Sequence, residues 1–116
     1  MSFTIAKRFR FEAAHSLPSL PEGHKCRRVH GHSYSVWLEL SGEVDEHGFV
    51  RDYGELGTAA DLIIRALDHR DLNEFIDPSS AEVLARWLYV QFQPICPELV
   101  AVRVSETETT WAEYRP

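Results

Sequence analysis

The stretch HGHSYSVWLEL, residues 30–40, alternates between two kinds of side chain. One set carries two histidines followed by apolar residues, while the other set is mostly small or polar. An alternation with period two is typical of a half-buried β-strand. Residues 3–15 show the same alternation, with Lys7 as the exception, and His15 falls on their apolar side. The N-terminal third of the chain therefore predicts two amphipathic strands, joined by a Pro- and Gly-containing loop over residues 16–29.

Two helices are predicted after these strands. Asp52 can cap the first one, because its carboxylate can accept a free backbone N–H, and Glu55 completes a capping-box pattern. Apolar residues at helical spacing follow. Ser79 and Glu82 repeat the device before a second apolar-periodic segment, which Pro94 ends.

The remaining segments complete the predicted fold. Residues 49–51 are expected to be a short extended piece, and residues 100–106 and 111–114 are expected to be strands. The order β-β-α-α-β-β predicts one α+β domain over residues 1–116. In this fold, a four-stranded antiparallel sheet has one face covered by two helices.

Composition bounds the function. The 116 residues are 44% hydrophobic, enough for one core, and such a small chain is expected to complete its pockets with neighbouring copies in a homo-oligomer. A net charge of −6 argues against nucleic-acid or anionic-membrane binding. The two cysteines form no disulfide framework, and no signal peptide or membrane-spanning run is recognisable. We therefore expect a cytoplasmic protein.

The histidines are candidate metal ligands. Residues i and i+2 of a strand point to one side, so His30 and His32 can reach one ion together, and His15 can join them if the first two strands pair. Three imidazoles suit zinc and leave a position for water or substrate. Two alternatives remain open: packed histidines without metal, and a closed structural site completed by Cys26 or His24.

Three further groups have chemical potential and ordinary explanations. Cys26 lies among cationic residues, which stabilise a thiolate, but it is equally well an unremarkable loop cysteine. The adjacent Asp68 and His69 can form a carboxylate–imidazole pair, although such pairs are common on surfaces. Glu106 ends an apolar strand face, either as the exit to solvent or as a buried acceptor for a ligand.

The motifs together resemble one family. Cys-x-x-x-His-Gly-His at 26–32, FEAAH ending at His15, LDHRDLN at 67–73 and SET at 105–107 are similar to the 6-pyruvoyl-tetrahydropterin synthase superfamily. The PEGHKC segment and the gap from Cys26 to His30 most resemble its 6-carboxy-5,6,7,8-tetrahydropterin synthases, which serve queuosine and deazapurine biosynthesis. The resemblance covers nearly the whole chain.

The resemblance implies a fold and an assembly. Members have the tunnel fold, in which subunit sheets close into a barrel within a trimer, and two trimers stack into a hexamer with active sites between subunits. The implied reaction converts 7,8-dihydroneopterin triphosphate to 6-carboxytetrahydropterin, acetaldehyde and triphosphate. The sister activity, which eliminates triphosphate to give 6-pyruvoyl-tetrahydropterin, and a non-catalytic zinc- or pterin-binding protein are the alternatives.

The resemblance also implies roles for residues. It makes Cys26 the general base. The implied zinc ligands are His15, His30 and His32, the implied proton-relay partners are Asp68 and His69, and the implied pterin contacts are Glu106 and Thr107. The triphosphate would be held by one or more of Lys25, Arg27 and Arg28. One departure is visible: where the family has Pro-Thr-x-Glu, this chain has DPSSAEV, in which Ser80 takes the place of the threonine.

Overall fold

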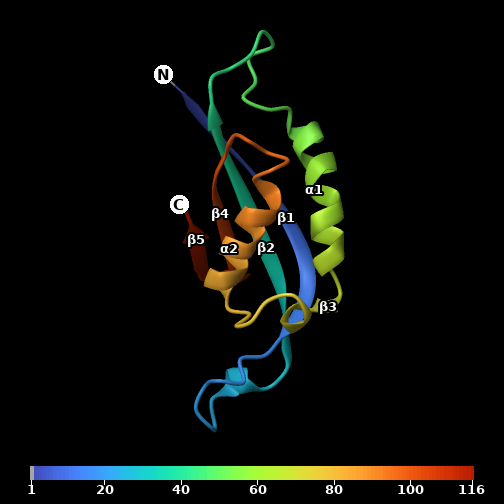
Figure 1. Ribbon diagram of the computed structural model, residues 1–116, viewed down its shortest axis with the longest axis vertical. Coiled ribbons are helices and arrows are strands. Elements are labelled where there is room, and N and C mark those ends of the chain that lie inside the picture. The colour runs from blue at the N-terminus through green and yellow to red at the C-terminus, as the bar shows by residue number, and fades with distance from the viewer. Residues whose placement is uncertain (1) are drawn as a thin grey trace.

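The two longest strands pair over their whole length in the computed structural model, which describes residues 2–116 (Figure 1). β1 (Phe3–His15) and β2 (His30–Gly42) run antiparallel, and the register places Phe3 opposite Gly42 and His15 opposite His30. The alternation in the sequence had predicted both strands. Their pairing brings the C-terminal end of β1 against the N-terminal end of β2, where the three candidate ligands lie.

The sheet has one more strand than predicted. β4 (Leu99–Thr107) pairs antiparallel with β2, and β5 (Thr110–Tyr114) pairs antiparallel with β4. The additional strand β3 (Arg70–Asp71) runs parallel to β1, so the sheet is mixed, with the order β3-β1-β2-β4-β5. The prediction of a four-stranded antiparallel sheet was therefore wrong at this edge.

Side-chain bonding explains the additional strand. Asp68 Oδ1 accepts the Glu12 N–H at 2.8 Å, and the His69 N–H donates to the Glu12 carbonyl at 2.5 Å. These two bonds hold the chain leaving the first helix against the edge of β1. The extended piece predicted at 49–51 is instead a bend, because Asp45 caps a tight turn and accepts the Phe49 N–H at 3.0 Å.

Both helices begin at side-chain caps. Asp52 caps α1 (Tyr53–Leu67), as predicted, and its side chain accepts the backbone N–H groups of Gly54 and Glu55. For α2 (Ala81–Phe92) the prediction was off by one residue. Ser80, not Ser79, is the cap, and its Oγ accepts the Val83 N–H at 3.2 Å. The side chain of Ser79 is instead buried, with 1% of its surface exposed. Two 3-10 turns, η1 (Lys25–Arg27) and η2 (Leu72–Glu74), complete the elements.

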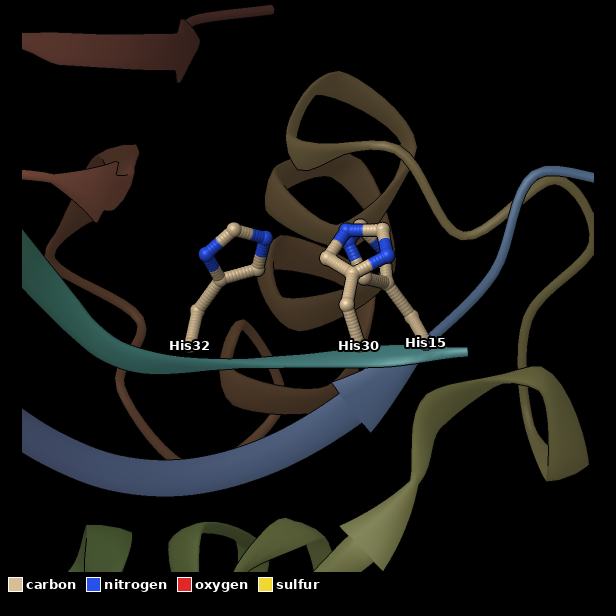
Figure 2. A group of neighbouring side chains, drawn as sticks. All are labelled: His15, His30 and His32. Atoms are coloured by element: carbon tan, nitrogen blue, oxygen red, sulfur yellow. The ribbon is translucent and has the colours of Figure 1, made fainter. Parts of the chain in front are cut away.

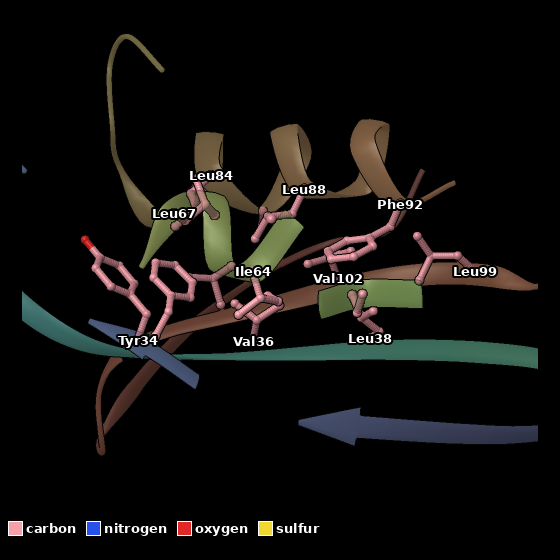
Figure 3. Packing of buried hydrophobic residues seen from close by; sticks show 14 of the residues in the cluster. Tyr34, Val36, Leu38, Ile64, Leu67, Leu84, Leu88, Phe92, Leu99 and Val102 are labelled. Atoms are coloured by element: carbon pink, nitrogen blue, oxygen red, sulfur yellow. The ribbon is translucent and has the colours of Figure 1, made fainter. Parts of the chain in front are cut away.

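The core lies between the helices and one face of the sheet (Figure 3). Apolar side chains of β1, β2 and β4 meet the buried stripes of both helices there. Fully buried members include Tyr34, Val36, Leu38, Leu67, Leu84, Leu88, Phe92 and Val102. The histidine end of β2 continues this face, so the candidate ligands lie at one end of the core.

Among the described residues, both helices pack on the core side of the sheet and none covers the opposite face. Arg8, Trp37 and Arg103 lie side by side across β1, β2 and β4, and the guanidinium of Arg103 lies 3.9 Å from the ring centre of Trp111. Among residues 2–116, no helix is both long and apolar enough to cross a membrane.

Candidate metal centre and its surroundings

Three histidines meet where β1 ends and β2 begins (Figure 2). His15 is the last residue of β1, while His30 and His32 lie on the core-facing side of β2. One ring nitrogen from each histidine lies within 4.8 Å of the others. The strand register and the i, i+2 spacing together therefore produce the predicted cluster.

Backbone carbonyls fix the tautomers of two of these rings. His15 Nδ1 lies 2.7 Å from the Ser79 carbonyl oxygen, and His30 Nδ1 lies 2.7 Å from the Arg28 carbonyl oxygen. Because a carbonyl only accepts, both Nδ1 atoms must carry the proton and donate. In the neutral rings, each Nε2 therefore keeps a free lone pair, which is the form in which histidine ligates a metal.

Two of the three Nε2 atoms face the Glu106 carboxylate but make no hydrogen bond in the part of the chain that the structure describes. Within the described residues, Nε2 of His15 and of His32 are buried without a hydrogen bond. Glu106 Oε2 approaches them without hydrogen-bond geometry, at 3.4 Å from His15 and 2.9 Å from His32. Buried polar atoms are normally bonded, so converging orphaned nitrogens indicate a missing ligand. The donor set of imidazoles beside a carboxylate suits a divalent transition metal, and the residues fit the implied ion.

The charges of this cluster are coupled. The Glu106 carboxylate raises the pKa of His15, and His15 in turn holds the pKa of Glu106 below its ordinary value. Burial lowers the pKa of His32. A cation is therefore favoured among these groups, either as a proton or as a metal ion.

The closed structural site is not what the structure assembles. Over residues 2–116, the cluster of ligand atoms contains the three histidines only. His24 Nδ1 is used to accept the Cys26 N–H at 3.1 Å, which caps η1. The Cys26 carbonyl accepts the Leu17 N–H at 2.8 Å, and its side chain is half-buried in a loop that projects beyond the histidine end of the sheet (Figure 1).

The predicted Asp68–His69 pair is formed. His69 Nδ1 lies 3.0 Å from Asp68 Oδ2, and His69 has a φ of 61°, a left-handed conformation held by the backbone bond to Glu12. The Glu12 N–H is the main reason that the pKa of Asp68 is lowered, and the His69 bond adds to it. His69 and His32 line one pocket of about 520 Å³. The pair is exposed, and His69 shares this pocket with one of the three candidate ligands.

The predicted pterin and triphosphate contacts line two other pockets. Thr107 and Glu106 line a pocket of about 640 Å³ that opens on the uncovered face of the sheet. Lys25, Arg27 and Arg28 line a smaller one of about 290 Å³ in the loop that carries Cys26, and Arg27 Nη1 is engaged with a loop carbonyl at 2.8 Å.

Three residues around the cluster were not predicted as functional. Asn73 and Ser79 belong to the hydrogen-bond network behind His15. Tyr34 lies against the His15 and His32 rings, and its buried hydroxyl has no hydrogen-bond partner within residues 2–116. Asn73 was in view as the last residue of LDHRDLN, and Ser79 as a cap. Tyr34 shares the alternation of the ligands, but nothing in the sequence shows that its hydroxyl lacks a partner.

Comparisons with known proteins agree with this geometry. The family model described as 6-pyruvoyl tetrahydropterin synthase matches residues 4–116. The 6-carboxy-5,6,7,8-tetrahydropterin synthase of Synechocystis is 38% identical over 95% of this chain and 91% of its own. That of Bacillus subtilis is 34% identical over 99% of this chain and 86% of its own.

A solved structure agrees as well. The 6-pyruvoyl tetrahydropterin synthase of Caenorhabditis elegans superposes with a TM-score of 0.88 at 26% identity, and the match covers 100% of this chain and 96% of that one. Sequence motifs, histidine cluster and fold thus point the same way. The chain belongs to the 6-pyruvoyl tetrahydropterin synthase family.

Proposed function

We propose that this chain is a zinc-dependent 6-carboxy-5,6,7,8-tetrahydropterin synthase acting on 7,8-dihydroneopterin triphosphate. The observation that carries the proposal is the meeting of His15, His30 and His32 beside Glu106, with the Nδ1 atoms of His15 and His30 already bonded to backbone carbonyls. It is supported by the similarity to 6-carboxy-5,6,7,8-tetrahydropterin synthases over nearly the whole chain.

The three histidines would hold the zinc ion through their Nε2 atoms. When bound, zinc supplies Lewis-acid polarisation of the substrate's side-chain hydroxyl oxygens, which makes neighbouring protons easier to remove. The chain's own contribution is a preorganised site, because the Ser79 and Arg28 carbonyls already fix two of the rings. Little reorganisation is then needed when the ion binds.

Glu106 and Thr107 would hold the pterin ring. The ring amino group and ring N–H present a two-donor edge, which one carboxylate can accept with both oxygens. The lowered pKa of Glu106 keeps that carboxylate ionised and able to accept. Lys25, Arg27 and Arg28 would bind the triphosphate, and their position in the Cys26 loop places that charge next to the proposed base.

Cys26 would remove a proton from the substrate side chain, and His69 would return one on the other face. Asp68 accepts from His69 Nδ1, so His69 Nε2 is the atom free to exchange a proton. The pocket that His69 and His32 both line supports this role. The carbon–carbon bond of the side chain then breaks, and acetaldehyde and triphosphate leave. One water molecule is consumed and supplies the second oxygen of the carboxyl group.

The site would be completed by assembly into a trimer whose sheets form a barrel, and two trimers would form a hexamer. Two features of the sheet support this. β3 pairs with β1 at Ala13 and Ala14 only, which leaves the edge of most of β1 open. β5 is the last strand on the other side, so its outer edge is also open. Open edges readily pair with another chain.

A product assay tests the proposal. The zinc-loaded protein is incubated with 7,8-dihydroneopterin triphosphate under anaerobic conditions, and the pterin and any aldehyde are identified by mass spectrometry. Carboxytetrahydropterin with acetaldehyde is expected. A pyruvoyl product would keep the metal site and replace the reaction by triphosphate elimination. A fully metallated protein without turnover would be a zinc- or pterin-binding protein, and the enzymatic proposal would be wrong.

A further inference from the structure

We propose that Asn73 is a positioning residue for the metal centre: its side chain ties the end of β1 to the segment before α2, and this tie orients the His15 ring. The inference rests on the metal-binding part of the proposed function. It concerns a residue that is bonded to none of the three histidines and that acts through Ser16, which follows His15, and through Ser79, whose carbonyl contacts the His15 ring.

The Asn73 amide forms two hydrogen bonds with the backbone of the residue that follows His15. Ser16 N–H donates to Asn73 Oδ1 at 2.9 Å, and Asn73 Nδ2 donates to the Ser16 carbonyl at 2.9 Å. These two bonds determine the orientation of the Asn73 amide, because the Ser16 N–H must face Oδ1 and the Ser16 carbonyl must face the NH₂ group. The amide therefore continues the bonding of β1 past its last residue and fixes the backbone from which His15 projects.

The same amide oxygen holds the segment that contacts the His15 ring. Ser79 Oγ lies 2.9 Å from Asn73 Oδ1 and 3.2 Å from the Ser16 carbonyl, and its side chain is buried. The carbonyl of this same Ser79 accepts from His15 Nδ1 at 2.7 Å. One side chain thus sets both the position of the imidazole and the position of the carbonyl that selects its tautomer.

Asn73 itself is held in place independently of the metal. Its backbone N–H donates to Asp71 Oδ1 at 2.9 Å, which caps the turn η2 directly after β3. β3 is in turn attached to β1 at Ala13 and Ala14. The network therefore closes on the strand that carries the ligand, and none of its hydrogen bonds requires an ion.

The expected consequence is a loss of preorganisation rather than of a ligand. Without the amide, the Ser79 carbonyl and the His15 backbone are free to separate, and neutral His15 can then also carry its proton on Nε2. That tautomer cannot bind a metal through Nε2. Partners that orient metal-bound histidines are worth roughly 10–100-fold in metal affinity, and we expect Asn73→Ala to weaken zinc binding by at least about tenfold.

Two neighbouring serines provide a matched pair of variants. Ser79→Ala removes the hydroxyl that joins the network, whereas Ser80→Ala removes only the cap of α2. Both lose one hydroxyl one residue apart, and both are expected to lower thermal stability. Only Ser79→Ala is expected to weaken zinc binding, in the same direction as Asn73→Ala.

The test combines zinc competition against a chromophoric chelator with NMR of the metal-free protein. Long-range ¹H–¹⁵N correlation at alkaline pH reports which nitrogen of His15 carries the proton. We expect a single Nδ1–H tautomer in the wild type and a mixture in Asn73→Ala and Ser79→Ala. Ser80→Ala should keep the wild-type tautomer and zinc dissociation constant.

An unchanged tautomer together with an unchanged zinc dissociation constant in folded Asn73→Ala would overturn the inference and leave Asn73 a purely structural residue. If Asn73→Ala fails to fold, Ser79→Ala decides by the same two readouts. A wild-type protein that binds no metal would refute the proposed function. The tautomer measurement would still decide separately whether Asn73 orients His15.

Discussion

Replacing Tyr34 by phenylalanine is expected to stabilise the metal-free protein. The Tyr34 ring is fully buried, stacks on Phe11 at 5.0 Å, and meets the edge of His32 at 5.5 Å. Its hydroxyl has no partner among the described residues. Burial raises the pKa of Tyr34, so the hydroxyl keeps its proton and remains an unsatisfied donor at any ordinary pH.

The magnitude follows from that missing partner. A buried polar group without a hydrogen bond costs about 1–3 kcal/mol, and a phenylalanine ring of the same shape carries no such cost. The removed oxygen leaves a small void that offsets part of the gain. We therefore expect Tyr34→Phe to raise the free energy of unfolding by about 1 kcal/mol. The stacked ring pair is retained, so the gain reports on the hydroxyl alone.

Tyr89→Phe is the matched control, because its hydroxyl does have a partner. The Tyr89 hydroxyl donates to the Leu99 carbonyl at 3.3 Å, and losing this bond should lower stability by about 0.5–1.5 kcal/mol. The two identical substitutions should thus have opposite signs. Urea unfolding curves of the metal-free proteins, all recorded at the same protein concentration, measure the stability change of each variant. A Tyr34→Phe protein less stable than wild type would refute the reasoning, since the hydroxyl would then be bonded.

Four further predictions concern the proposed chemistry. Cys26→Ala should leave folding and zinc content intact while kcat falls by roughly two to four orders of magnitude, and unchanged turnover would exclude it as the base. His32→Ala should lower the zinc stoichiometry measured by elemental analysis, and full metal content would refute its role as a ligand. Asp68→Asn should reverse the His69 tautomer, because the amide donates to Nδ1 where the carboxylate accepts. We expect kcat to fall by roughly 10²–10⁴-fold at normal zinc content, and wild-type turnover would contradict the relay. Unfolding and refolding an equal mixture of inactive Cys26→Ala and His69→Ala proteins should restore about a quarter of the activity if sites are shared between subunits, whereas sites within one chain would give none.

Most of the fold was predictable because its signals are local. Alternation over residues 3–15 and 30–40 predicted β1 and β2 to within a residue or two, since apolar residues at every second position leave one face to bury. Asp52 began α1 as expected. The misses came where a side chain bonded to a distant backbone, as Asp68 does with Glu12 to create the edge of β3.

The cap of α2 illustrates the same limit. Ser79 and Ser80 are identical side chains in adjacent positions, and either could begin the helix by its pattern. The structure chose Ser80 because Ser79 finds a buried partner in Asn73, on a segment outside the helix.

The sequence by itself determined the elements and the identity of the candidate ligands. Side chains two residues apart on a strand point to the same face, so the sequence alone puts His30 and His32 together and puts His15 on the apolar side of its own strand. Tertiary structure decided how those ligands are prepared. The bond that fixes the His15 tautomer joins residues 64 positions apart, and Glu106 arrives from another strand. Such contacts depend on how the whole chain folds back on itself, and no local pattern encodes them.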